Sequence, residues 1–563
     1  MSEIAALNYK WSCRIVSQLY NFGVRTVCIS PGSRNTPLTL AFLEYGKFDC
    51  VSHIDERSGS FFGLGVALKT QNPVAILSTS GTATANFLPA VIEASQSRVP
   101  LIILTADRPT KLIGTGANQT IIQKNIYGYY VRRSTDVGLP SIKMNGLDSS
   151  INSALQLSTG INWNNELVSP QGPVHLNIPF DEPLYRSDRS KKNIEFELTN
   201  QSSLSITAEP EIEIPEFKFP IIVCGRLPVG FNTAPIIELS SYLNAPIFAD
   251  PLSQIRYGKK YPNIITMYDH FLKLQKISPD FIIRIGQKPV SKVLCEKLDE
   301  WNKFSILIDA CGRFNDNCKL ILSQEIESAT TFIKSKTKPV DLEWRNKILE
   351  IDSKVKNSII KNHVNSWFEG SIAKACFDSL SDGDSFFIGN SMPIRDVDMF
   401  VASSDKRIHT YANRGASGID GIVSSALGTA AKSDGNTLLL IGDLSFYHDM
   451  NGLLVGFRNN INLTIVVVNN GGGGIFSFLP ISNEKGSHFD EFWSTSHDLN
   501  FSHVAKLYHC NHRKVDSLPS LNLALTEFKS STGINIIEAM TDINQNVIEH
   551  KAISIALEQL KLP

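Results

Sequence analysis

The sequence predicts an α/β protein of three domains, each with a mostly parallel sheet flanked by helices. Short, continuously apolar runs recur along the chain, end at glycine- or serine-rich turns and are followed by helical patterns. Such runs are typical of buried parallel strands in βα units. The chain is 563 residues long, and at about 150 residues per domain this length favours three domains over one.

The first predicted domain covers residues 1–185. Its apolar runs are Thr26–Ser30, Val74–Leu77 and Leu101–Leu104, each followed by a small-residue or polar turn. The segment closes with a last strand-like stretch, Gly172–Leu184.

The second predicted domain covers residues 186–345 with its linkers. It begins with a polar stretch rich in Ser, Glu and Pro up to residue 219, as linkers often are, and continues with the strand-like Pro220–Cys224. A lysine-rich stretch near residues 335–344 marks its end, and no dinucleotide-binding fingerprint lies within it.

The third predicted domain covers residues 346–563 and repeats the pattern of the first. Three of its strands end at polar turns, in SFFIGN, TLLLIGD and LTIVVVNN. Because ligands of open parallel sheets bind beyond the carboxyl ends of the strands, we expect the chemistry there.

The overall composition argues against several classes of partner. The formal net charge of −1 provides no basic field for nucleic acid or an anionic membrane. None of the nine cysteines forms a CxxC pair, which argues against a zinc knuckle or redox dithiol and suits reduced thiols. We find no secretory signal and no uninterrupted apolar run of membrane-spanning length, and therefore expect a cytoplasmic protein without a membrane span.

The strongest chemical signal is a pair of polar turns after two apolar strands. One strand ends at Gly442-Asp443 and the next at Asn470. Carboxylate and amide oxygens suit Mg²⁺ or Ca²⁺ rather than zinc, and a helix opening near Ser445 would direct free N–H groups at an anion. The sequence therefore predicts a metal-held diphosphate, although either dipeptide alone could be a turn former.

This pattern resembles the cofactor motif of thiamine diphosphate enzymes, in which GD is followed after about thirty residues by NN. Leu444 departs from the commonest GDG form. The resemblance implies a thiamine diphosphate-binding fold and a metal ion, Mg²⁺ or alternatively Mn²⁺, held by Asp443, the side chain of Asn470 and the carbonyl of Gly472. It also implies a glutamate that hydrogen-bonds the aminopyrimidine ring and helps to generate the ylide, for which Glu56 in DERSG is the candidate.

Further motifs narrow the resemblance. The chain is similar to the MenD family of 2-succinyl-5-enolpyruvyl-6-hydroxy-3-cyclohexene-1-carboxylate synthases of menaquinone biosynthesis. The resemblance implies that 2-oxoglutarate is decarboxylated and that its succinyl-semialdehyde carbanion adds to isochorismate, releasing CO₂. The motifs that carry it, in chain order, are SPGSRNTPL, DERSG, STSGTA, LTADRP, GANQTI, GNSMPIRD, NRGASGIDG and GDLSFYHD with NNGGGGIF.

Arginines fit these dicarboxylate substrates, because a guanidinium binds carboxylate in a bidentate manner and stays charged when buried. Arg34, Arg108, Arg395 and Arg414 are all placed in glycine- or proline-marked turns at predicted strand ends. Each alone could be a surface or structural arginine, but four in such places favour an anion pocket.

The resemblance assigns roles position by position. Catalytic roles fall to Glu56, Arg395 and Arg414. Contacts with 2-oxoglutarate fall to Arg395 and Arg414, and contacts with isochorismate fall to Ser33, Arg34, Arg108, Asn118, Gln119 and Lys292, with Lys288 an alternative to Lys292. An apolar wall of the site is formed by Ile475, Phe476 and Leu479, which could equally be core residues. Cofactor contacts fall to Glu56, Ser391, Met392, Ile419, Gly442, Asp443, Leu444, Ser445, Asn470, Gly472 and Ile475.

Two kinds of alternative function stay open. Another thiamine lyase, an acetohydroxyacid synthase or a 2-oxo acid decarboxylase, would handle monocarboxylates and need fewer arginines. The absence of an adjacent histidine pair favours a carboligating synthase, and no general acid is visible. A non-catalytic regulatory protein that retained the fold is the alternative outside enzymes.

The resemblance implies a homodimer or homotetramer with active sites at subunit interfaces.

Overall fold

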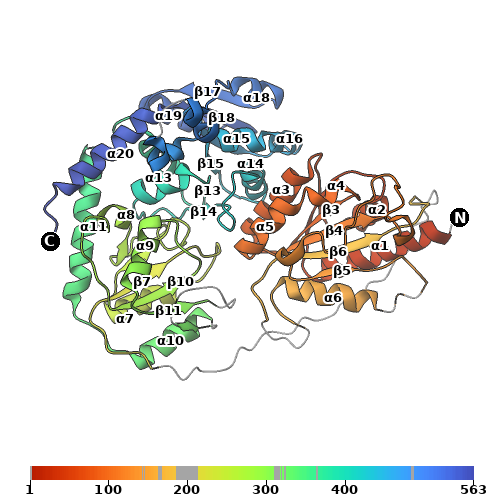
Figure 1. Ribbon diagram of the computed structural model, residues 1–563, viewed down its shortest axis with the longest axis horizontal. Helices are drawn as coiled ribbons and strands as arrows, with labels where there is room; N and C mark the ends of the chain where they lie inside the picture. Colours follow the sequence, from red (N-terminus) through yellow and green to blue (C-terminus); the bar gives the residue numbers. More distant parts are fainter. Residues whose placement is uncertain are drawn as a thin grey trace. The chain divides into compact units, whose positions relative to one another are not determined.

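The computed structural model describes residues 3–142, 144, 146–162, 168–185, 213–309, 318, 320–322, 325–362, 365–483 and 487–563. Their strands form three six-stranded sheets in which every pair of neighbouring strands runs parallel, with helices around them (Figure 1). The predicted α/β architecture with three parallel sheets is confirmed. The domain boundaries stay a prediction, and most of the expected linker at 186–219 lies outside the described residues.

The first sheet has the strand order β2-β1-β3-β4-β6-β5. Strands β3 and β4 are buried along their whole length, as expected for strands covered by helices on both faces. Its strands are β1 Thr26–Ile29, β2 Asp49–Ser52, β3 Val74–Ser78, β4 Leu101–Asp107, β5 Ser134–Asp136 and β6 Val174–Pro179. Its helices are α1 Glu3–Asn21, α2 Thr36–Tyr45, α3 Glu56–Thr70, α4 Thr82–Ala85, α5 Leu88–Ser97 and α6 Leu147–Ser158, with 3₁₀ turns at Thr110–Leu112 and Gly128–Tyr130.

The central sheet has the order β9-β8-β7-β10-β11-β12, so that the chain winds outward from β7 in both directions. Its strands are β7 Pro220–Cys224, β8 Ile247–Ala249, β9 Ile264–Ile265, β10 Phe281–Ile285, β11 Phe304–Ile308 and β12 Leu320–Leu322. Its helices are α7 Ala234–Leu243, α8 Tyr268–Phe271, α9 Lys292–Trp301 and α10 Ile326–Lys336.

The third sheet, β14-β13-β15-β16-β18-β17, has the same relative strand order as the first. The three strand ends that the sequence singled out belong to β13, β15 and β16, which are neighbours in this sheet. Its strands are β13 Ser385–Ile388, β14 His409–Tyr411, β15 Thr437–Gly442, β16 Leu463–Asn469, β17 Asn511–Val515 and β18 Ile534–Met540. Around it lie α12 Glu369–Ser379, α13 Met392–Phe400, α15 Asp443–Asp449, α16 Leu453–Arg458, α17 Ser487–Phe489, α18 Ser502–Leu507, α19 Leu518–Lys529 and α20 Ile543–Glu558, with short 3₁₀ or π turns at Met450–Gly452, Gly474–Phe478, Pro480–Asn483 and Asp490–Ser494.

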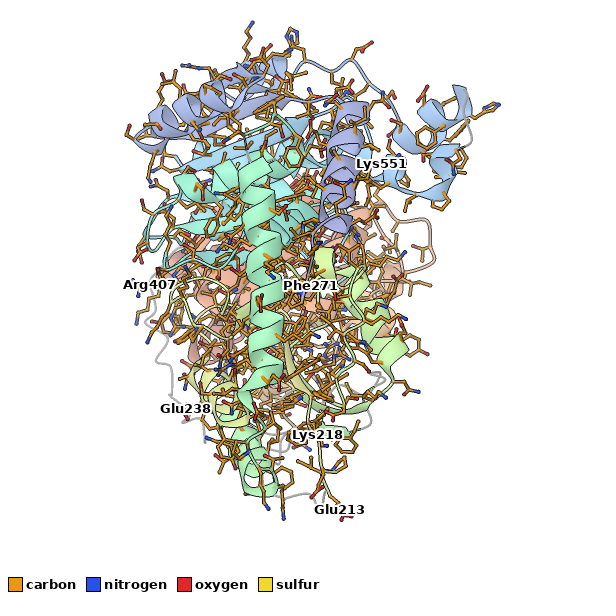
Figure 2. All side chains as sticks on the ribbon, turned by 90° about the vertical axis from the view of Figure 1, so that its left-hand side faces the viewer. Glu213, Lys218, Glu238, Phe271, Arg407 and Lys551 are labelled. Carbon is orange, nitrogen blue, oxygen red and sulfur yellow. The ribbon has the colours of Figure 1, made fainter. Side chains whose placement is uncertain are left out.

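Helix α11 (Leu342–Asn362) begins where the sequence suggested a boundary, and it is the long helix in the foreground of Figure 2. Its buried residues Ile348, Ile351, Val355 and Ile359 recur at helical spacing and pack in one core with residues of the central sheet and α20. None of the described helices is both long and apolar enough to cross a lipid bilayer.

The chain divides into two compact units, each described by itself below. The first unit contains Met1–Thr207, Asn413–Lys432 and Asn451–Val455, and the second unit contains the rest. Helix α14 (Ile422–Ala430) therefore belongs to the first unit, where it packs on α3. The two helices touch backbone to backbone, because a Cβ at Gly65 would lie 1.9 Å from the carbonyl oxygen of Ser425.

Candidate active site

Asp443 stands at the carboxyl end of β15 in the second unit and binds the turn that follows the neighbouring strand β16. The side chain is 2% exposed. Its Oδ1 accepts a hydrogen bond from the N–H of Leu444 (2.6 Å), and its Oδ2 accepts from the N–H groups of Asn470 (3.2 Å), Gly471 (2.9 Å) and Gly472 (3.0 Å). The two predicted polar turns thus form one structure.

The helix expected to open near Ser445 is present and begins two residues earlier. Helix α15 begins at Asp443, and Gly442 is its N-cap residue in an extended conformation. Strand β15 therefore runs into the helix without a loop, and Asp443 itself caps a first-turn N–H through its bond to Leu444. Leu444 and the buried Ser445 lie within the first turn.

Asn470 is oriented by a buried glutamate that the sequence did not reveal. The Asn470 Nδ2 donates to Glu369 Oε1 (2.8 Å), which also accepts from Thr541 Oγ1 (3.3 Å). Because Nδ2 is engaged there, the carbonyl oxygen of the Asn470 amide faces the turn, where it accepts from the Gly472 N–H (3.2 Å).

Acidic groups are concentrated around this turn. Burial, and then the nearby Asp396, raise the pKa of Glu369 to about 8. Burial also raises the pKa of Asp443, against which His497 acts with its Nε2 3.4 Å from Asp443 Oδ2. Burial raises the pKa of Asp396 as well, whose Oδ1 lies 3.4 Å from His550 Nε2. A cation bound here would offset the cost of burying these carboxyl groups.

The donor set at the turn fits a hard divalent cation. Asp443, the Asn470 amide and the Gly472 carbonyl offer only oxygen atoms, which Mg²⁺ prefers. Across the part of the chain that the structure describes, no group of three or more His, Cys, Asp and Glu side chains could hold a metal ion. The predicted set differs from such a group, since it contains a single acidic side chain.

Helix α13 places three predicted contacts after strand β13. Ser391 is its N-cap with a φ of 70°, and the buried Met392 is its first residue. Arg395 donates from Nη1 to the Ser391 carbonyl (2.5 Å), and burial lowers its pKa while Asp396 and Asp269 act against this. The expectation that Arg395 lies in a turn is wrong: Pro393 marks the first turn of a helix, where proline is tolerated.

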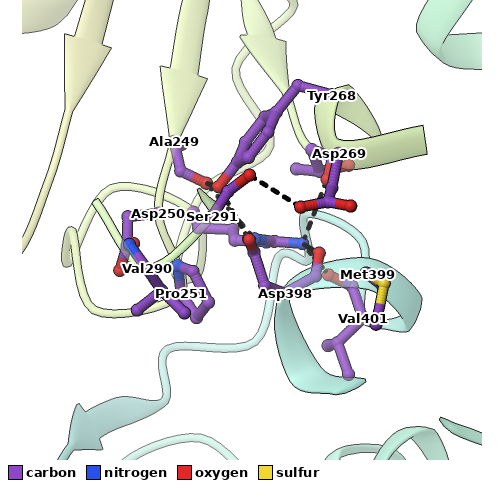
Figure 3. Close-up of polar contacts among 12 residues, drawn as sticks. Ala249, Asp250, Pro251, Tyr268, Asp269, Val290, Ser291, Asp398, Met399 and Val401 are labelled. Carbon is purple, nitrogen blue, oxygen red and sulfur yellow. Dashed lines mark hydrogen bonds and ion pairs between the residues drawn. The ribbon is translucent and has the colours of Figure 1, made fainter. Parts of the chain in front are cut away.

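A buried network around Asp398, close to Tyr268 and Val401 in Figure 3, fixes the other end of α13. Arg256 is fully buried and donates to Asp398 Oδ1 (2.8 Å) and to the carbonyls of Asp398 (2.7 Å) and Val401 (2.5 Å). Tyr268 donates to the same Asp398 Oδ1 (2.6 Å). The loop after β8 and helix α8 thus hold the helix that carries Arg395.

The remaining predicted residues of the second unit are more exposed. Ile475 and Phe476 lie in the 3₁₀ turn Gly474–Phe478, which has no buried residue, and Leu479 is 41% exposed. This exposure argues against core packing for these residues. Lys292 forms an exposed ion pair with Glu296 (3.4 Å), and Lys288 is also exposed, so that the choice between the two lysines stays open.

Glu56 is the first residue of α3 in the first unit, and it is half-buried. The preceding Asp55 caps the helix by accepting from the N–H groups of Arg57 (2.8 Å) and Ser58 (3.3 Å). Asn451 donates to the other oxygen of Asp55, and Asn86 Nδ2 lies 3.4 Å from Glu56 Oε2. The start of α3 is therefore fixed while the Glu56 side chain keeps access to solvent.

The predicted anion-binding residues of the first unit come together in part. Arg108 donates from Nη1 to Ser80 Oγ and to the carbonyl of Gln119 (3.1 Å), and Gln119 Nε2 donates to the carbonyl of Ser80 (3.0 Å). Burial lowers the pKa of Arg108, and repulsion from the nearby Arg34 lowers it further. The two guanidinium groups therefore lie close enough to repel each other, and Glu182 and Asp107 offset part of this repulsion.

Arg34 itself is almost completely buried. It donates to the Phe180 carbonyl (3.0 Å) and to Glu182 Oε1 (2.8 Å). Ser33, which precedes it, is exposed, as is Asn118, which precedes Gln119.

Arg414 and the exposed Ile419 lie on the loop between β14 and α14. The residues that follow Arg414 donate their N–H groups to Glu93 of α5. Sequence reasoning missed this glutamate as it missed Glu369, because neither belongs to a motif with a fixed spacing.

Comparisons with known proteins show what the chain is similar to. A family model described as the N-terminal TPP binding domain of thiamine pyrophosphate enzymes matches residues 11–126, and the C-terminal TPP binding domain model matches residues 398–539. Curated relatives named 2-succinyl-5-enolpyruvyl-6-hydroxy-3-cyclohexene-1-carboxylate synthase include one from Listeria innocua, 37% identical over 96% of this chain and 95% of the relative. Another, from Bacillus cytotoxicus, is 36% identical over 98% of this chain and 96% of the relative.

A solved structure supports the fold. The X-ray structure of a proposed thiamin diphosphate-dependent enzyme isolated from Mycobacterium smegmatis aligns with a TM-score of 0.70 at 17% identity. The alignment covers 93% of this chain and 98% of the other.

Proposed function

The chain belongs to the family of thiamine diphosphate-dependent 2-succinyl-5-enolpyruvyl-6-hydroxy-3-cyclohexene-1-carboxylate synthases, and on this premise we propose how its residues perform the reaction. The enzyme decarboxylates 2-oxoglutarate and joins the remaining four carbons to isochorismate, releasing CO₂. The observation that carries the proposal is the single hydrogen-bonded structure that Asp443 forms with the Asn470–Gly472 turn at two neighbouring strand ends.

In our proposal, this turn holds Mg²⁺ or Mn²⁺ together with the diphosphate of the cofactor. The ligands are the Asp443 carboxylate, the Asn470 side-chain carbonyl and the Gly472 main-chain carbonyl. When bound, thiamine diphosphate supplies the nucleophilic carbon and the electron sink that decarboxylation of a 2-oxo acid requires. Further contacts to the cofactor come from Ser391, Met392, Ile419, Gly442, Leu444, Ser445 and Ile475.

Glu56 holds a proton at the aminopyrimidine ring through a hydrogen bond from its carboxyl group. Its position supports this role, since the capped first turn of α3 fixes its backbone while the side chain stays half-buried. A carboxyl placed in this way acts as a general acid–base group.

Arginines recognise the two dicarboxylate substrates. Arg395 and Arg414 bind the carboxylates of 2-oxoglutarate, and the cluster of Arg34 and Arg108 binds isochorismate. Ser33, Asn118, Gln119 and Lys292 (or Lys288) add polar contacts to isochorismate. The partly exposed Ile475, Phe476 and Leu479 line the site and exclude water from it.

The proposal includes an assembly and a location. We propose a homodimer or homotetramer in the cytoplasm, with each active site formed by two subunits. Light scattering after size-exclusion chromatography of the holoenzyme tests the assembly, and a monomer that is fully active would contradict it.

The test of the function is product formation and CO₂ release from 2-oxoglutarate, with thiamine diphosphate and Mg²⁺, in the presence and absence of isochorismate. Product forms only with both substrates and both cofactors. A Glu56→Gln variant loses at least about two orders of magnitude in rate. The control Glu343→Gln, an exposed glutamate in the first turn of α11, keeps the parent rate.

Other outcomes would assign the enzyme differently. Turnover of pyruvate with 2-oxoglutarate inert would favour an acetohydroxyacid synthase or a 2-oxo acid decarboxylase. A protein that binds no cofactor in a titration would be a non-catalytic relative.

A further inference from the structure

Glu93 is a buried glutamate whose carboxylate is fully occupied by hydrogen-bond donors. It lies on α5 with 3% of its surface exposed. Its Oε1 accepts from Ser97 Oγ (2.5 Å) and from the Gly415 N–H (2.7 Å), and its Oε2 accepts from the N–H groups of Ala416 (2.7 Å) and Ser417 (3.2 Å). A carboxylate offers about four lone-pair positions, so that these four donors match its capacity.

Three of the four donors are consecutive backbone groups of one loop, Asn413–Gly421. The loop is seated directly on α5, because a Cβ at Gly415 would lie 2.7 Å from the Glu93 carbonyl oxygen and from the Ser97 backbone nitrogen. Successive N–H groups that converge on one anion form a concave site of fixed shape. The carboxylate therefore determines the path of the backbone from residue 415 to residue 417.

Packing would not replace these bonds. A cavity of about 260 Å³ lies beside the same loop, lined by Phe61, Ile92, Ala416 and Asp420 among others. Glu93 lines this cavity as well, and because open volume offers the loop few packing contacts, the hydrogen bonds to Glu93 hold it.

We propose that Glu93 is a positioning residue for the loop that presents Arg414 and Ile419. Arg414 directly precedes the first N–H group that Glu93 binds, so the direction in which its guanidinium leaves the backbone is set by this carboxylate. The inference rests on the proposed role of Arg414 in binding 2-oxoglutarate. Glu93 touches neither substrate and acts only through the loop.

The decisive change is Glu93→Gln, which keeps the size of the side chain but replaces one acceptor oxygen with an NH₂ group. That group would face backbone N–H donors and could not accept from them. We expect the KM for 2-oxoglutarate to rise about tenfold or more, the loss expected for one charge-assisted hydrogen bond. The KM for isochorismate stays the same and kcat falls less than the KM rises, which a general loss of folding would not produce.

A second readout needs no substrate. Release of the loop exposes the Arg414–Gly415 bond, so limited trypsin digestion cuts there several times faster in the holoenzyme of Glu93→Gln than in the parent. Ser97→Ala is the matched control, because it removes the one side-chain donor and leaves all three backbone bonds in place. It should give parent-like values in both measurements.

Glu93→Asp serves if Glu93→Gln does not fold, since it keeps the charge and retracts it by one methylene. It is expected to show an intermediate KM for 2-oxoglutarate and an intermediate cleavage rate. Parent-like KM and cleavage in whichever of the two variants folds would overturn the proposal. Faster cleavage at Arg414 with a parent enzyme that is inert toward 2-oxoglutarate would instead uphold the loop contact and refute the proposed function.

Discussion

Replacing Arg256 with methionine should destabilise the second unit more than any surface change. The variant removes a fully buried guanidinium and leaves Asp398, which is 2% exposed, with the Tyr268 hydroxyl as its remaining side-chain partner in the network. Removing one member of a buried ion pair costs about 3–5 kcal/mol. The short bonds to the carbonyls of Asp398 and Val401 are lost as well, which favours the upper half of this range.

Urea unfolding followed by tryptophan fluorescence measures this loss, because four of the six tryptophans (Trp301, Trp344, Trp367 and Trp493) belong to the second unit. The transition of that unit is fitted by itself, since a chain of two units need not unfold in one step. Arg407→Met, at an exposed arginine, is the control and should change the free energy of unfolding by no more than about 0.5 kcal/mol.

The double variant Arg256→Met with Asp398→Leu tests the reason for the loss. If an unpaired buried charge causes it, removing both charges should leave the unit more stable than Arg256→Met alone. A single variant that loses less than about 1 kcal/mol, or a double variant that loses the sum of both singles, would refute the reasoning.

Two further predictions follow from the site and the first sheet. Glu369→Leu removes the acceptor that orients the Asn470 amide and should weaken Mn²⁺ binding, measured by calorimetry, about 10- to 100-fold. Glu369→Gln retains a carbonyl acceptor and should bind Mn²⁺ nearly as the parent does. Equal affinities in all three proteins would contradict this prediction. Burial lowers the pKa of His175 to about 3. As the pH falls below about 6.5, this histidine is protonated in the unfolded chain but stays neutral in the folded chain. The free energy of unfolding therefore decreases by about 1.4 kcal/mol per pH unit between pH 6.5 and pH 3. His175→Gln should flatten this dependence between pH 7.5 and pH 5, and an unchanged slope would show that His175 does not cause it.

Strands and helix starts, which depend on residues close together in the sequence, could be predicted from it. Apolar runs such as Leu101–Leu104 and Leu438–Ile441 contain no polar residue that would favour an exposed position. Their assignment as buried parallel strands was confirmed. The helix expected near Ser445 is likewise present and begins at Asp443, directly after the strand.

Contacts between residues far apart in the sequence could not be predicted in this way. Glu369 is 101 residues from Asn470, and Glu93 is 322 residues from Gly415. In the sequence, a single glutamate on a helix looks the same whether it is solvated or buried. Its hydrogen-bond donors come from distant parts of the chain and are known only from the folded structure. The roles of the predicted substrate contacts stay predictions, since they depend on molecules that the chain binds.

The packing of α14 on α3 has a consequence for the order of events during synthesis. The N-terminal unit lacks part of its structure until Asn413–Lys432 leaves the ribosome, and about 225 residues separate Thr207 from Lys432. At roughly 5–20 residues per second this interval lasts on the order of 10–45 s. During that time the small-residue face of α3 lacks the α14 helix that covers it in the folded chain, and faster translation shortens this interval.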